Sequence, residues 1–164
     1  MLHYIVIVHR VSGVPLFNYK VSRDYITIQP ELLTGLLTAL REFTKELQIG
    51  ELSSFNSMNK RVVISVGKYI YAAVVIDYDN NIEEWKRNAF KIVKTFEMKY
   101  DLISFKGSLP QFKDFKRELE NLLLQFEWKA GDKHPISHLN LKRFIIYDYT
   151  EKVYYDYTEF DTIK

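Results

Sequence analysis

Residues 70–76 read Ile-Tyr-Ala-Ala-Val-Val-Ile and form the longest apolar run in the chain. A second run, residues 4–8, reads Tyr-Ile-Val-Ile-Val close to the N-terminus. Both runs have the length of a strand, and both are apolar at adjacent as well as alternate positions, so each strand needs cover on both faces. We therefore predict that these two strands lie in the middle of a sheet with helices on both sides.

Three further strands are predicted around this central pair. Residues 15–20 begin with Pro15, which lacks a backbone donor and therefore suits an edge strand. Residues 52–58 carry many polar side chains, as edge strands do. Residues 61–66 precede Gly67-Lys68, a plausible two-residue hairpin turn into the central run. Numbered along the chain, the five strands are expected in one antiparallel sheet with the order 2-1-5-4-3.

Apolar residues at helical spacing predict three helices. The first begins at Pro30 and runs to about Leu47. The second begins near Asn81, and the third spans about residues 109–128. One helix on one face of the sheet and two on the other give an α/β (α+β) fold.

The first helix has more apolar surface than a core-facing helix needs. Its apolar arc is about 160° wide, against a minimum of about 100°. Leu33 and Leu37 lie toward the margin of this arc. They either complete the core or extend into a surface that meets a partner.

Composition excludes several classes of function. The chain has 164 residues, no cysteine, and 23 Lys and Arg against 21 Asp and Glu. The missing cysteines exclude disulfides, thiolate metal sites and a cysteine nucleophile. The balanced charge lacks the basic footprint of a nucleic-acid binder, so we expect no nucleic-acid partner. No apolar run is long enough to span a membrane, and we expect a cytoplasmic protein that reaches membranes only through partners.

The sequence has no motif that indicates catalysis. Neither a phosphate-binding GxxxxGK[ST] loop nor a Gly-x-Ser-x-Gly turn occurs. His134 and His138 have a spacing that brings two imidazoles together only on a helix, and Pro135 between them favours a loop. We therefore expect a protein that is not an enzyme and that needs no metal or cofactor.

One short segment has the start of a calcium-binding pattern. Asp77, Asp79 and Asn81 have the spacing of the first three ligands. Ile82 then occupies the place of the required glycine, and Asn88 that of the bidentate glutamate. A turn followed by a helix cap is the better interpretation.

The C-terminal residues differ from the rest of the chain. We predict a domain of residues 1–131 and an extension of residues 132–164 that is rich in tyrosine. In the extension, residues 147–151 read Tyr-Asp-Tyr-Thr-Glu and recur as residues 155–159. Residues 141–147 and 152–157 are expected to form a β-hairpin. The extension packs on its own domain or pairs with another chain.

Three segments resemble the longin and roadblock superfamily, including its archaeal, adaptor-subunit and tethering-subunit members. Residues 12–17, Ser-Gly-Val-Pro-Leu-Phe, look like the first hairpin of these proteins. Residues 32–46 resemble their first helix, and residues 96–100 look like the end of their second helix. Gly35 is then expected where the first helix approaches the sheet closely.

The resemblance implies a binding role. Longin and roadblock domains serve as platforms in small-GTPase regulators, adaptor complexes and tethering complexes, and they commonly dimerise through the first helix and the neighbouring edge strand. We therefore expect a non-catalytic scaffold that forms a homo- or heterodimer and engages a small GTPase or membrane-trafficking machinery. A small-molecule-sensing domain is the alternative. The residues expected at the partner surface are Leu33, Leu37, Arg41 and Phe55.

Overall fold

The computed structural model describes residues 1–21, 28–103, 105, 107 and 109–126, together with the backbone of residues 144–148 and 153–157. In chain order the elements are β1 (Leu2–His9), β2 (Pro15–Lys20), α1 (Pro30–Glu46), β3 (Ser54–Asn56), β4 (Lys60–Val66), β5 (Ile70–Asp77), α2 (Ile82–Lys99), the short 3-10 helix η1 (Pro110–Phe112), α3 (Phe115–Phe126), β6 (Phe144–Asp148) and β7 (Val153–Tyr157).

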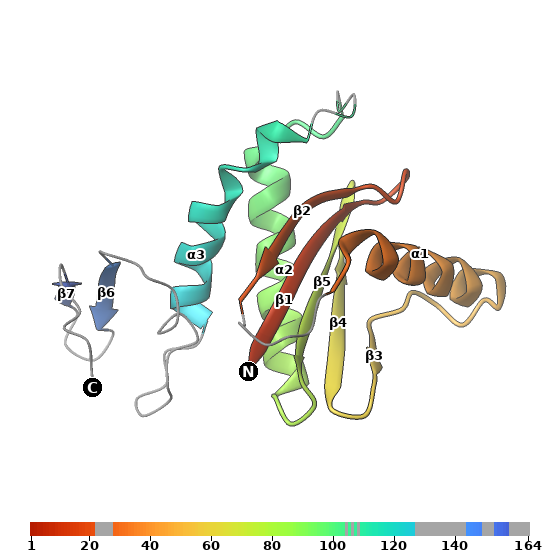
Figure 1. Ribbon diagram of the computed structural model, residues 1–164, viewed down its shortest axis with the longest axis horizontal. Helices are drawn as coiled ribbons and strands as arrows, with labels where there is room; N and C mark the ends of the chain where they lie inside the picture. Colours follow the sequence, from red (N-terminus) through yellow and green to blue (C-terminus); the bar gives the residue numbers. More distant parts are fainter. Residues whose placement is uncertain are drawn as a thin grey trace.

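Strands β1 to β5 form one antiparallel sheet with the predicted order β2-β1-β5-β4-β3 (Figure 1). The two central strands are β1 and β5, which pair from Leu2 with Ile76 to His9 with Ile70. All but the last residue of each strand is buried. The double burial confirms the prediction made from the two apolar runs.

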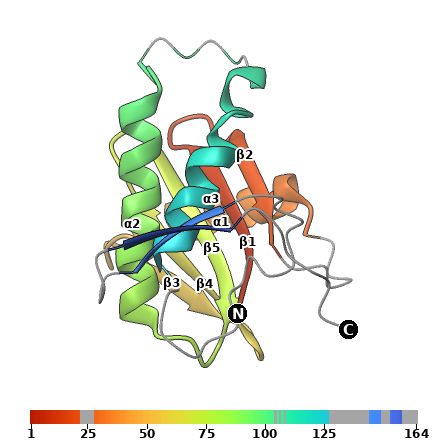
Figure 2. The ribbon, with the colours of Figure 1, turned by 90° about the vertical axis from the view of Figure 1, so that its left-hand side faces the viewer.

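Helices cover both faces of the sheet, as predicted. The α2 and α3 helices lie together on one face and α1 lies on the other (Figures 1 and 2). The larger core lies under α2 and α3, where the rings of Phe96 and Phe115 are 4.8 Å apart and those of Phe96 and Phe112 are 5.3 Å apart. The smaller core lies under α1 and consists of Tyr4, Val6, Val8, Leu37, Val62, Ile64, Tyr71, Ala73 and Val75.

The segment that mimics a calcium loop is a turn and a helix cap. The Asn81 side chain accepts hydrogen bonds from the backbone amides of Glu83 and Glu84, at 3.1 and 3.2 Å. An asparagine at this position satisfies amides that the first turn of a helix leaves unpaired. Among the described residues, no group of three or more His, Asp or Glu side chains is arranged to hold a metal.

The structure corrects two details of the helices. The single helix predicted over residues 109–128 is divided into η1 and α3, and Phe112 and Phe115, on either side of the division, are both buried in the core. The expected close approach at Gly35 is also wrong, because a Cβ there would meet no atom within 4 Å. Of the glycines that the structure describes, Gly67 is the most crowded, since a Cβ there would lie 2.6 Å from the Cγ1 of Val93.

In the extension, β6 and β7 pair antiparallel as a separate two-stranded sheet. The domain boundary at residue 131 stays a prediction. His134 and His138 lie outside the described residues. In the described part of the chain, no helix is both long enough and apolar enough to cross a membrane.

Candidate protein-binding surface

The α1 helix touches the sheet along a narrow side. Only Thr34 and Leu37 of its 17 residues are buried. The Thr38 hydroxyl lies 3.3 Å from the Tyr71 hydroxyl, and the Arg41 guanidinium stacks over the Tyr71 ring at 4.5 Å. These contacts fix which side of α1 faces the sheet.

Next to the side that faces the sheet, α1 exposes a continuous row of large apolar side chains. Their exposed fractions run from 49% to 70%. At about 100° per residue the four positions fall within an arc roughly 60° wide. Exposed apolar patches of this kind mark interaction sites on soluble proteins. We call the row the α1 stripe; it consists of Leu32, Leu36 and Phe43 of α1 and of Leu47, the residue that caps the C-terminus of the helix.

Next along the chain, β3 is an open edge of the sheet. The amide of Ile64 on β4 donates to the Ser53 carbonyl at 2.8 Å, and the Ser57 amide donates to the Lys60 carbonyl at 2.8 Å. Because backbone groups alternate in direction along an antiparallel strand, those of Ser54 and Asn56 point away from β4. An open edge of this kind is a template for pairing with another strand.

The four predicted partner residues all lie on the side of the sheet that α1 covers, but they are not equally exposed. Leu33 and Phe55 are half-buried and pack against the core under α1. Arg41 is half-buried as well. Leu37 is fully buried, so its side chain completes the core and is not available to a partner.

The α1 stripe is the part of this surface that the sequence analysis missed. Its four residues belong to the apolar arc of the helix, and the excess width of that arc was the available signal. Of the two margin residues, Leu37 is buried, since Thr38 and Arg41 of α1 contact Tyr71, which is remote in sequence. A partner role of Leu33, Arg41 and Phe55 stays a prediction.

The Arg41 side chain links α1 to one end of the sheet. Its Nη2 lies 3.8 Å from Oε1 of Glu51, and the same oxygen accepts a hydrogen bond from Arg10 at 2.8 Å. Arg10 also donates to the Gly67 carbonyl at 3.1 Å. Burial raises the pKa of Tyr71, although Thr38 and Arg41 oppose this rise. The guanidinium of Arg41 therefore lies between the Tyr71 ring and the Glu51 carboxylate of its own chain.

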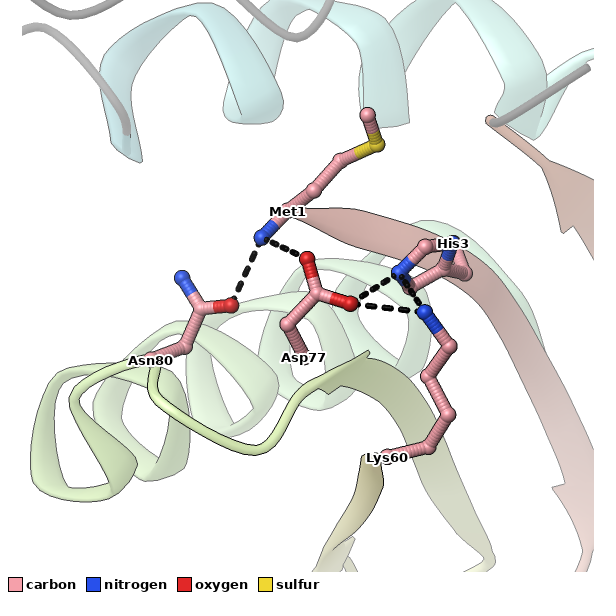
Figure 3. A network of polar contacts seen from close by, with 5 residues as sticks. All are labelled: Met1, His3, Lys60, Asp77 and Asn80. Carbon is pink, nitrogen blue, oxygen red and sulfur yellow. Dashed lines mark hydrogen bonds and ion pairs between the residues drawn. The ribbon is translucent and has the colours of Figure 1, made fainter. Parts of the chain in front are cut away.

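A second polar cluster lies where β1, β4 and β5 meet (Figure 3). The Asp77 carboxylate accepts from the Met1 amine at 2.7 Å and from Lys60 at 2.6 Å, and its Oδ1 lies 2.7 Å from Nε2 of His3. The Met1 amine also donates to Asn80 at 2.7 Å. Partial burial favours the neutral acid, but these hydrogen bonds outweigh it and hold the pKa of Asp77 well below its usual range. The cluster joins three strands through one carboxylate.

The surface also has two shallow depressions. One, of about 350 Å³, lies between Leu52 and Ser53, the end of β4, and Phe90 of α2. The other, of about 500 Å³, lies over α3 beside Lys99. Both open to solvent, and neither is lined by a buried polar side chain. The second is lined only by charged side chains that are exposed or half-buried, and it lacks the mostly apolar lining that is typical of a small-molecule site.

The fold can be compared with known proteins. No protein-family model matches the chain, and no curated protein matches its sequence. A solved structure of MglB with a tetrameric arrangement matches with a TM-score of 0.50 and 12% identity, over 60% of this chain and 79% of that one. Myxococcus xanthus MglB matches with a TM-score of 0.45 and 14% identity, over 59% of this chain and 85% of that one. At such identity the first match speaks for architecture alone, and it shows that this chain has a longin-like fold.

Proposed function

We propose that the chain is a non-catalytic scaffold of the longin type, which pairs with a second copy of itself through the α1 stripe and the β3 edge and binds a small GTPase. The observation that carries the proposal is the row of four exposed apolar side chains on a helix that is otherwise thinly packed. Removing such a row from water stabilises an assembly by about 25 cal/mol for each Å² of apolar surface buried.

The open edge beside the stripe favours a second copy as the occupant. In a two-fold pair, each α1 packs on its counterpart and each β3 offers unpaired backbone groups to the other, so both features are satisfied at once. The tetrameric arrangement of MglB gives a precedent for assembly by this fold. The small-GTPase partner rests on the resemblance to longin and roadblock proteins.

The mass of the full chain in solution tests the homodimer. At tens of micromolar, light scattering should give twice the chain mass of 19.6 kDa. Phe43→Asp places a charge in the α1 stripe and should yield monomers. Phe90→Asp is the matched control, because Phe90 is 50% exposed against 59% for Phe43 but lies on α2. A monomeric wild-type chain, or equal effects of the two variants, would contradict the proposed dimer.

Binding to nucleotide-loaded GTPases tests the second half of the proposal. The immobilised full chain should retain at least one small GTPase of the source organism, and should prefer either its GDP form or its form with a non-hydrolysable GTP analogue. If every GTPase passes through in both forms, the GTPase part is wrong and the dimer is judged on its own result.

A further inference from the structure

The α2 helix carries a basic face that points away from the sheet. Residues 85–96 contain four cations and no acidic residue. The buried residues of α2 face the sheet, which leaves Arg87, Lys91 and Lys94 exposed on the opposite side. Phe90 and Met98 are exposed beside them. We call these five residues the basic α2 face.

The cations of this face lack carboxylate partners in the described part of the chain. Glu83 pairs with Lys86 at 2.9 Å, and Glu97 accepts a hydrogen bond from the Tyr69 amide at 2.8 Å. Two of the three cations, Lys91 and Lys94, lie over aromatic rings instead. The Lys94 ammonium lies 5.4 Å from the centre of the Phe90 ring. A partner that fits this surface has both acidic groups and aromatic rings.

The chain leaves α3 beside this face. The ring of Phe126, the last residue of α3, lies 5.6 Å from the Lys91 ammonium. The 17 residues between α3 and β6 can reach about 50 Å when extended. That reach exceeds the length of α2, about 27 Å for its 18 residues. Every position on the basic α2 face is therefore within reach of the residues that follow.

The segment at the end of this connection has the complementary composition. Residues 147–161 contain five acidic residues against one lysine, and they contain five of the 12 tyrosines of the chain. The acidic residues are Asp148, Glu151, Asp156, Glu159 and Asp161.

We propose that residues 147–161 dock on the basic α2 face of their own chain. Carboxylates of the segment pair with Arg87, Lys91 and Lys94, and its tyrosine rings cover Phe90 and Met98. Each exposed ion pair contributes little alone, but a short tether gives the segment an effective concentration in the millimolar range. The docked segment covers the basic α2 face, which lies on the opposite side of the sheet from the α1 stripe.

Zero-length cross-linking of the full chain tests this docking. A carbodiimide joins a lysine to a carboxylate only where the two are in contact, and peptide mass spectrometry locates the link. An equimolar mixture of 14N and 15N chains separates links within one chain from links between two. We expect links from Lys91 and Lys94 to acidic residues of 147–161, with both peptides carrying the same isotope.

Variants at one arginine show whether the charge of the face holds the segment. Arg87→Glu keeps both reactive lysines and should lower the yield of these links about threefold, a change typical for one exposed ion pair. Arg87→Lys should restore the yield. Arg117→Glu is the matched control on the exposed side of α3 and should leave the yield unchanged.

Other outcomes would overturn the proposal. Links of mixed isotope would assign the segment to a second copy, and links at neither lysine would remove the docking. Equal effects of Arg87→Glu and Arg117→Glu would show unspecific attraction. The full chain is also tested for sedimentation with phosphatidylserine vesicles. Sedimentation that Arg87→Glu abolishes, without links inside the chain, would assign the face to an anionic lipid surface.

Discussion

Asp77 shows how one residue ties the ends of three strands. Its carboxylate meets the Met1 amine, which directly precedes β1, at 2.7 Å and Lys60 of β4 at 2.6 Å, and it stays partly exposed. Because two of these partners are remote in sequence, the ties form only when β1, β4 and β5 are assembled. The contribution of Asp77 to stability therefore belongs to the folded sheet and is absent from the unfolded chain.

We predict that Asp77→Asn lowers the free energy of unfolding by about 2 kcal/mol at neutral pH, the scale of hydrogen bonds to a charged group. Asp79→Asn, an exposed neighbour, should change it by less than about 0.5 kcal/mol. Urea denaturation of both variants gives the comparison. Equal losses would mean that the contacts of Asp77 add nothing.

We expect acid to remove the contribution of the Asp77 carboxylate to stability. The pKa of Asp77 is lowered in the folded state, so its contribution is complete above the unfolded pKa of about 3.9 and disappears as the pH falls through the folded value. We expect the unfolding free energy of the wild type to fall more steeply than that of Asp77→Asn between about pH 5 and pH 2. Parallel curves from denaturation series at each pH would contradict this.

We predict that replacing glycine by alanine has opposite effects on stability at Gly67 and at Gly35. At Gly67 a Cβ would lie 2.4 Å from Oε1 of Glu97 and 2.6 Å from Cγ1 of Val93, so Gly67→Ala should cost about 1–3 kcal/mol. Gly35 is exposed in the middle of α1 with free space around it, and Gly35→Ala should stabilise by about 0.5–1 kcal/mol. Thermal melts of both variants check the signs. Equal signs would show that local space does not decide the effect.

At the scale of the element, α1 depends on a single buried leucine. We predict that Leu37→Ala costs about 3 kcal/mol, because it opens a cavity that the thin contact of α1 cannot refill. Leu32→Ala removes the same atoms from an exposed position and should cost less than about 0.5 kcal/mol at submicromolar concentration. Denaturation of both variants provides the measurement. A similar cost at both positions would place α1 differently on the sheet.

The same helix shows why some elements could be predicted and some contacts could not. The existence of α1 follows from Pro30 and the spacing of its apolar residues, which are local signals. Its rotation does not, because Thr38 and Arg41 meet Tyr71 only after β5 has joined the sheet. The sequence therefore predicts a helix with excess apolar surface, but it does not indicate that Leu37 is buried and that the α1 stripe is exposed.

At the scale of the molecule, the strand order could be predicted because central and edge strands differ clearly in their sequences. Two runs that are apolar on both faces belong in the centre, and Pro15 and the polar residues near β3 belong at the edges. The division of the third helix into η1 and α3 left no such mark. Phe112 and Phe115 both enter the aromatic cluster around Phe96, but their spacing of three residues is equally typical of an unbroken helix.

The proposed dimer makes the stability of the whole molecule depend on its concentration. If two copies bury the α1 stripe, mass action should raise the melting temperature of the wild type by about 3–5 °C for a hundredfold increase in protein concentration. Phe43→Asp should remove this dependence, since its chain unfolds as a monomer, whereas Phe90→Asp should retain it. Calorimetry over that range makes the measurement. A melting temperature that stays constant for the wild type would mean that the exposed row on α1 gains nothing from a second copy.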